Sequence, residues 1–141
     1  MSEAEARARA LDDRARLVRV LAEMADLRRN MGDGEGAIAA GQQALELAAE
    51  IGDMPLQGEA SLCLGQAYYY IGDIDRAAEL LRWSVEAADR EPGQPHTDVR
   101  IRSWAWLALT LSALGALLLR LVRLDHVPIA TDSMTPSMKA D

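Results

Sequence analysis

The side chains best suited to chemistry are few and widely separated along the chain. Cysteine and histidine, the usual soft-metal ligands, occur only as Cys63, His96 and His126. No two of them stand at the short spacing that a metal site requires. Cys63 has leucine on both sides, which predicts a buried packing role, and the two histidines lie in loop-like sequence, which predicts exposure. The sequence therefore predicts neither a metal site nor a cofactor.

Two further motifs have the spelling of catalytic or nucleotide-binding patterns. Glu46 and Glu50 would share a helix face, but the histidine, metal ligands or apolar cleft that acid–base catalysis needs are missing around them. The run Gly32-Asp33-Gly34-Glu35-Gly36-Ala37 matches the dinucleotide-binding pattern of three small residues. A helical pattern precedes it where a dinucleotide-binding loop needs a strand, and its two acids would repel a pyrophosphate. We expect a turn followed by a helix start here, and no enzymatic activity.

Composition favours an all-α protein. Half of the 141 residues are hydrophobic, yet only 4% are aromatic and Phe is absent. A core of Leu and Ala suits closely packed helices, and no stretch alternates polar and apolar residues as a strand would. The net charge of −7 is unevenly placed: residues 31–98 hold three Arg and thirteen acids, about −10, and the two ends of the chain are slightly positive. Because this middle would repel phosphate, we expect no nucleic-acid partner.

The sequence also predicts a cytoplasmic location. A single cysteine excludes an intrachain disulfide and suits a reducing cytosol. Residues 1–9 alternate acids, Ala and Arg without an apolar core, which is unlike a secretory signal.

Helical periodicity predicts five helices separated by glycine-rich breaks. Asp33 and Asp73 follow two of these breaks and are predicted N-caps, while Pro55 suits a helix's first turn. Residues 125–141 are polar and hold two Pro, which predicts a mobile tail after a folded domain of residues 1–124. The expected helices cover residues 3–30, 35–51, 55–71, 74–90 and 98–124, with a loop at 91–97. In the first helix, one apolar stripe is expected to contain Leu11, Leu17, Val18, Leu21, Met24, Ala25 and Leu27.

An internal repeat defines the expected architecture. The pair Gly-Asp at 32–33 recurs 40 residues later at 72–73, and Leu114-Gly115 follows after 43 more. Self-similarity at this period indicates a helical solenoid, in which each hairpin buries its apolar face against its neighbours. The middle copy resembles the tetratricopeptide repeat (TPR), with Leu64-Gly65, Tyr68, Ala77 and Leu81 in the pattern and Ser61 replacing the customary Trp. The resemblance implies a right-handed α-solenoid of antiparallel helix hairpins.

The TPR resemblance covers two full copies and part of a third. They span about residues 17–51, 59–90 and 99–124. In the third copy Trp104, Leu107, Ala108 and Leu111 match the first helix, and the pattern fails after Gly115. Two phrases, IGDMPLQGEASLCLGQAYYYIGDIDRAAELLRWSVEA and RSWAWLALTLSALG, are also similar to repeats that follow the ATPase module of bacterial adenylate/guanylate cyclase-like and transcription-regulator-like signalling proteins. That likeness implies a fragment or relative of such a protein, without its nucleotide-binding or cyclase motifs.

The family resemblance implies a protein-interaction or scaffold role, with a protein, peptide or adjoining domain held along the first helix of each hairpin. Tyr68 should pack between hairpins, and Tyr69 and Tyr70 then either anchor a partner in the groove or cover the next helix. By the repeat spacing, the implied partner-binding residues are Arg19, Asp26, Arg29, Asn30, Glu59, Gln66, Tyr69, Tyr70 and Arg102.

The last predicted helix has two alternative environments. Residues 103–119 carry no charge, and their helix would be roughly 25 Å long against a hydrocarbon core of about 30 Å. Trp104 and Trp106 would suit a bilayer interface, so a membrane-anchored protein with one span near 103–122 is the alternative. The residues that match the repeat favour a capping helix covered by protein: its own hairpins, a second copy of the chain, or a larger parent protein.

Overall fold

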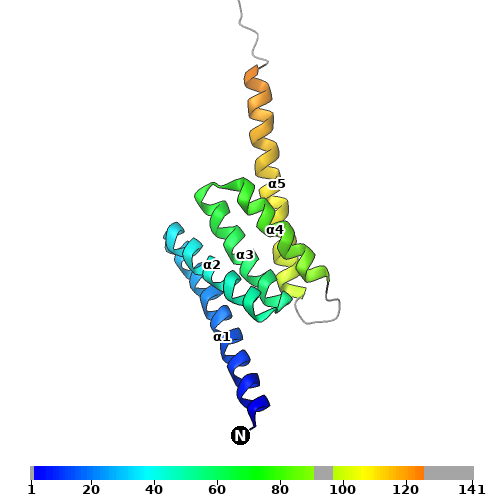
Figure 1. Ribbon diagram of the computed structural model, residues 1–141. Helices are drawn as coiled ribbons and strands as arrows, with labels where there is room; N and C mark the ends of the chain where they lie inside the picture. The colour runs from blue at the N-terminus through cyan, green and yellow to red at the C-terminus, as the bar shows by residue number, and fades with distance from the viewer. Residues whose placement is uncertain (1, 91–96, 126–141) are drawn as a thin grey trace, which may run out of the picture.

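The computed structural model describes residues 2–90 and 97–125, and within them every element is a helix. These are α1 (Glu3–Asn30), α2 (Gly34–Ile51), α3 (Met54–Ile71), α4 (Ile74–Asp89) and α5 (Thr97–Asp125) (Figure 1). This confirms the expected all-α class with five helices. Of the expected tail 125–141 and the expected loop 91–97, residues 125 and 97 belong to α5. The rest of both segments, with His96 and His126, lies outside the described residues.

Aspartate caps and glycine turns set the helix ends. Asp33, Asp53 and Asp73 are N-caps whose carboxylates accept a hydrogen bond from the backbone N–H three residues later, at 2.9, 3.0 and 3.3 Å. The glycine before each aspartate has a positive φ, from 75° to 89°, which side-chain-bearing residues rarely adopt. The predicted caps Asp33 and Asp73 are thus confirmed, and Asp53 adds a third at the break before α3.

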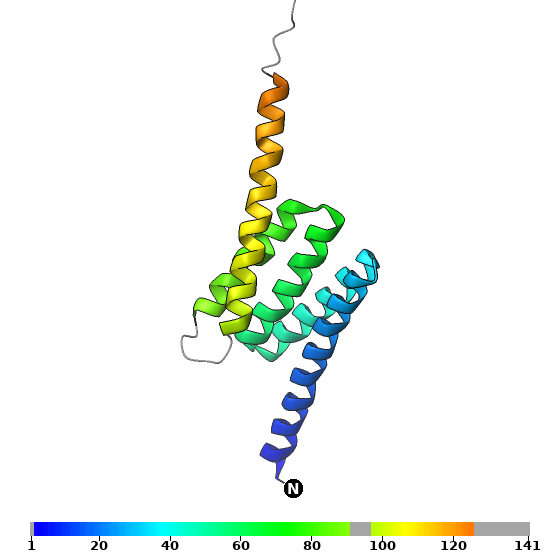
Figure 2. The ribbon, with the colours of Figure 1, turned by 180° about the vertical axis from the view of Figure 1, so that it is seen from behind.

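The helices form a tight inner row and an outer row. α1 contacts α2 and α3, while α5 contacts α3 and α4; among the described residues α2 and α4 do not contact each other. The row α1, α3, α5 is therefore the closely packed one, and we call its surface away from α2 and α4 the inner face (Figure 2). The hairpins α1–α2 and α3–α4 stack side by side through α3, as a repeat array requires.

α3 lies at the centre of the core, where every residue from Ser61 to Tyr68 is buried. Glycines allow its neighbours to approach closely: a Cβ on Gly41 of α2 would lie 3.1 Å from Leu64, and one on Gly65 would lie 2.9 Å from Leu81 of α4. Tyr68 fills the space between hairpins as expected, with its hydroxyl accepting from Gln42 at 3.2 Å. These contacts explain why the repeat pattern has a glycine at position 65 and a tyrosine at position 68.

The single apolar stripe predicted for α1 is wrong. Val18 is 1% exposed and packs inward, whereas Leu11, Leu17 and Leu27 are 50%, 49% and 59% exposed. Leu17 and Leu27 lie on other faces of α1 than Val18, and only the face toward α2 and α3 is covered. Leu11 lies seven residues before Val18 and so on the same face, but in the N-terminal half of the helix. The N-terminal half of α1 projects beyond the other helices (Figure 1).

The packing register predicted for α5 is also partly wrong. Leu107 is buried as expected, but Trp104 and Leu111 are 53% and 40% exposed. The buried side instead carries hydroxyls: Ser103 donates to the Val99 carbonyl at 2.7 Å and pairs with Ser84 of α4 at 2.8 Å. A helix face that packs through hydrogen-bonded hydroxyls has no row of large apolar residues to mark it in the sequence. Residue size therefore favoured Trp104 as a buried residue, and that prediction is wrong.

Candidate functional site

Asp26 of α1 joins two helices on the inner face through its carboxylate. One oxygen lies 3.3 Å from Nη2 of Arg29 on the same helix, and the other lies 3.5 Å from Nη2 of Arg102 on α5. The Asp26 side chain is 29% exposed, so these ion pairs are partly shielded from solvent. Residues 76 positions apart in the chain are thereby held together at one place.

Gln66 of α3 links the same carboxylate to the far side of the row. With its amide nitrogen toward Asp26, it donates to Oδ1 at 3.1 Å, and its oxygen accepts from Nε1 of Trp106 at 2.7 Å. This orientation satisfies both ends of the amide. Because Gln66 is 1% exposed, its part is to position its neighbours and not to touch a partner.

Trp106 forms the aromatic centre of the inner face. The edge of Tyr69 meets it with ring centroids 5.6 Å apart at 73°, and the Arg29 guanidinium lies 5.5 Å from its ring centroid. Both are favourable ring geometries. We call Asp26, Arg29, Gln66, Tyr69, Arg102 and Trp106 the inner cluster.

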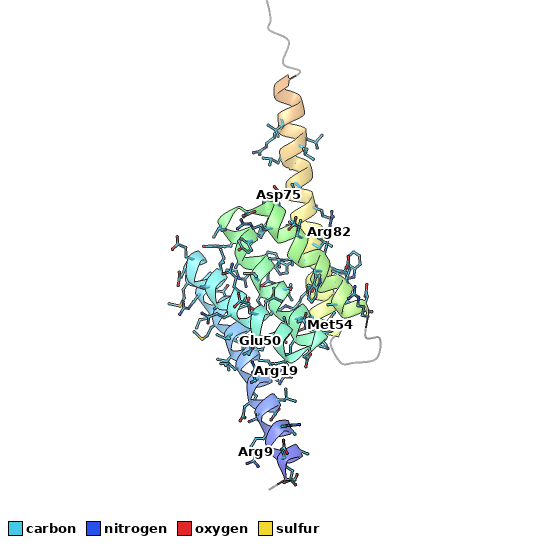
Figure 3. The ribbon with its side chains drawn as sticks, viewed as in Figure 1. Arg9, Arg19, Glu50, Met54, Asp75 and Arg82 are labelled. Carbon is cyan, nitrogen blue, oxygen red and sulfur yellow. The ribbon has the colours of Figure 1, made fainter. Side chains whose placement is uncertain are left out.

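The structure brings five of the nine predicted partner-binding residues into the inner cluster: Asp26, Arg29, Gln66, Tyr69 and Arg102. The other four lie around it. Arg19 (Figure 3) and Asn30 are exposed on α1, Glu59 is half-buried on α3, and Tyr70 is 58% exposed. Trp106 was missed by sequence reasoning, although its position one helical turn after Arg102 could have indicated it.

The inner cluster has more hydrogen-bond donors than acceptors. Two guanidinium groups share the one carboxylate of Asp26. The Nε of Arg29 is buried and has no hydrogen-bond partner among the described residues. A buried donor without an acceptor is costly, but this atom is out of reach of a bound chain. A carbonyl or carboxylate oxygen of such a chain would instead meet Arg102, whose side chain is 39% exposed.

Cys63 lies beneath the inner cluster as an inert thiol. Burial raises its pKa to about 12, with a smaller contribution in the same direction from Asp26. The thiol is therefore neutral at physiological pH, which accords with the predicted packing role. Among the described residues, no three His, Cys, Asp or Glu side chains form a group that could hold a metal ion.

We expect native Cys63 to resist alkylation by iodoacetamide at pH 8, and the urea-unfolded chain to react at the rate of an ordinary thiol. Because the folded-state pKa is the higher one, the buried neutral thiol stabilises the fold below about pH 8.5 and loses that effect as the pH rises toward 12. Mass spectrometry of timed samples measures the labelling. Rapid labelling of the native chain would contradict the burial.

A shallow hollow lies apart from the inner cluster. It has a volume of about 420 Å³, between the N-terminal half of α1 and the α2–α3 turn. Its lining residues are Leu11, Asp12, Ala15, Ile51, Gly52 and Asp53. Most of this lining is apolar or a capping group, so the hollow offers none of the polar contacts found in the inner cluster.

Comparison with known families agrees with the stacked hairpins. The family model of the tetratricopeptide repeat matches residues 16–90, which span most of α1 and all of α2, α3 and α4. The chain belongs to the tetratricopeptide-repeat family. No curated protein and no solved structure matches it significantly. TPR domains are interaction modules that typically lack catalysis, and α5 lies beyond the matched repeats.

Proposed function

We propose that this TPR protein is a non-catalytic scaffold module that holds a peptide or an adjoining domain across its inner face. The proposal places it in the cytoplasm, as a fragment or relative of a larger bacterial signalling or regulatory protein. The observation that supports it most is the inner cluster, where the partly exposed side chains of Arg102 and Tyr69 lie together.

The accessible part of this surface is small and mixed in character. The Arg102 side chain is 39% exposed, against 15% for Arg29, and Tyr70 stands free at 58%. A bound chain would meet Tyr70 first and the arginines below it. Tyrosine and arginine are the side chains that contribute most often to binding energy in interfaces. Tyr69 packs edge-on against Trp106, so it supports the surface while covering α5.

We expect Tyr70→Ala to weaken peptide binding at least about tenfold without loss of helix content, because truncating an exposed anchor typically costs more than 1 kcal/mol. A random peptide library selected on the immobilised full-length chain supplies the ligands, and calorimetry supplies their affinities. The double variant Tyr69→Ala/Tyr70→Ala should bind still more weakly.

The matched control for Tyr70→Ala is Arg82→Ala on the outer row, where Arg82 is exposed on α4 (Figure 3). It should leave the affinity within about twofold, as expected of a residue outside the interface. Selected peptides that bind Tyr70→Ala as tightly as the unaltered chain would remove the inner face from consideration.

We also propose self-association through α5. Its outward residues include Ile101, Trp104, Leu117 and Leu119, at 53% to 69% exposed. Apolar surface of this extent on one helix normally marks an interaction site. A TPR array whose terminal helix is apolar needs such a cover.

A membrane anchor is the second candidate, because α5 is long and apolar enough to cross a bilayer. From Asp98 to Leu121 its mean hydropathy is 1.6, and only 11% of the most apolar stretch is buried. The packing of α5 opposes this candidate. Residues 99–107 lie against α4, whose Arg82, Glu86 and Asp89 are exposed and would enter the hydrocarbon at the same depth. Carbonate washing of membranes decides between the two: an integral span stays with the lipid, whereas a protein-covered helix is released.

A further inference from the structure

The outer side of α5 carries an apolar stripe at heptad spacing. Its positions alternate by three and four residues, as in a helix–helix seam. Each large member is 40% to 61% exposed, so neither α3 nor α4 covers the stripe. We define the α5 stripe by its members Ile101, Trp104, Ala108, Leu111, Gly115 and Leu118.

Among the described residues, no neighbour accounts for Gly115 within this stripe. The helical glycines Gly41, Gly58 and Gly65 each face a neighbour that a Cβ would press, whereas a Cβ on Gly115 meets nothing within 4 Å. Its φ is not in the left-handed region that requires glycine. A mid-helix glycine makes a helix less stable than alanine would. Its presence on an exposed face therefore indicates a close approach by a group outside the chain.

The α5 stripe is complementary to itself when two copies run antiparallel. Antiparallel heptad seams pair the two kinds of stripe position, so Trp104 would lie over Gly115 of the second copy. In the same register Ala108 would face Leu111, and Ile101 would face Leu118. Large residues thus meet small ones at the centre, and the two-fold axis would pass between residues 109 and 110. The two copies of Ser112 would then lie five residues, or roughly 7.5 Å, apart along the helices.

The hairpin α3–α4 uses the same arrangement within this chain. There, Gly65 receives Leu81 and Gly58 receives Ala87 between two antiparallel helices. In the repeat, the first helix of each hairpin offers this face to its own second helix. α5 occupies the first-helix position after two complete hairpins, so its equivalent face is open among the described residues.

The area on offer matches a stable symmetric pair. The exposed parts of Ile101, Trp104, Leu111 and Leu118, with exposed Ala108 between them, amount to roughly 500 Å² per copy, or about 1,000 Å² in total, which reaches the lower limit of a specific interface. A bilayer fits less well, since α5 is free of α4 only from about residue 111. The 11 residues up to 121 span roughly 16 Å, about half of the hydrocarbon core.

We infer that the α5 stripe is a two-fold interface with a second copy of this chain, the two α5 helices packing antiparallel with Trp104 against Gly115. This inference rests on the proposed self-association and adds the face, the direction and the register. The interface is isologous and closes as a dimer. The inner face stays open in both copies.

Three variants of the full-length chain test the inference by sedimentation equilibrium. Gly115→Leu should weaken the dimer at least about tenfold by filling the space for Trp104, yet keep or raise the melting temperature, because the added side chain clashes with nothing in one copy. Leu118→Glu should do the same by placing a charge in the seam. Leu117→Glu is the matched control: Leu117 is 55% exposed against 59% for Leu118, but points about 100° away from it.

Cross-linking tests the register. Ser112→Cys should join two copies through a short bis-maleimide, whereas Leu117→Cys should not, and Cys63 stays silent because it is buried. A monomeric unaltered chain at 100 μM overturns both self-association and the inference. A dimer that tolerates Gly115→Leu and Leu118→Glu leaves self-association standing and overturns the face. If Leu117→Glu weakens the dimer as much as Leu118→Glu does, the two-fold interface is overturned in favour of a partner that surrounds the whole helix, such as lipid.

Discussion

Leu81→Ala should lower the free energy of unfolding by about 2–5 kcal/mol, among the largest single losses available in this fold. Leu81 is 0% exposed and belongs to the core cluster that joins α3, α4 and α5, with Leu62, Val85 and Leu107. Its removal leaves a cavity at the point where α4 crosses Gly65. Urea denaturation followed by circular dichroism measures the change.

A double-mutant cycle shows whether the glycine contact is responsible. Gly65→Ala alone should destabilise by about 1 kcal/mol or more, since its Cβ would lie 2.9 Å from Cγ of Leu81 and outweigh the gain in helix propensity. In the Leu81→Ala background the same change should cost nothing or stabilise. The double variant should therefore lose less unfolding free energy than the two single variants lose together, by about 0.5–3 kcal/mol. Simple additivity would mean that the two residues do not press on each other.

Gln66→Leu should destabilise by about 1–3 kcal/mol and release α5 selectively. The change keeps the volume of the side chain but leaves the Trp106 indole N–H without its acceptor and Asp26 without one of its donors. Hydrogen exchange resolved by segment is the informative measurement. Protection should fall most in α5, because the α1–α2 and α3–α4 contacts within each hairpin do not pass through Gln66.

Gln43→Leu is the control for Gln66→Leu, since Gln43 is an exposed residue of α2. It should change neither the unfolding free energy by more than about 0.5 kcal/mol nor the exchange of α5. Equal loss of protection in all helices of Gln66→Leu would contradict the idea that the amide acts as a link between α5 and the hairpins.

Features that act locally could be predicted from the sequence. The glycine–aspartate breaks could be predicted because a positive φ favours glycine and an N-cap needs a short side chain that accepts a hydrogen bond. Both requirements hold whatever surrounds the turn. The packing roles of Gly65 and Tyr68 could be predicted because the repeat pattern requires a small residue where two helices touch and a large one where a gap must be filled. The same pattern led to five residues that meet in the inner cluster.

Features that depend on which face is covered could not be predicted. α1 has apolar residues on more than one side, and periodicity cannot tell the covered side from the exposed ones, so Leu17 and Val18 were assigned to one stripe. In α5, residue size favoured Trp104, but the hydroxyl of Ser103 determines which side faces α4. Trp106 became visible only when Gln66 and Arg29 were placed beside it.

In this fold each helix contacts only the next helix or the next but one along the chain. Contacts of such short sequence separation are formed early, with little loop-closure entropy, so folding is expected on the microsecond-to-millisecond scale of low-contact-order proteins. Refolding can begin in either hairpin and spread to the other through α3. Loss of α5 would then leave a two-hairpin unit whose refolding rate is nearly unaltered while its unfolding becomes faster.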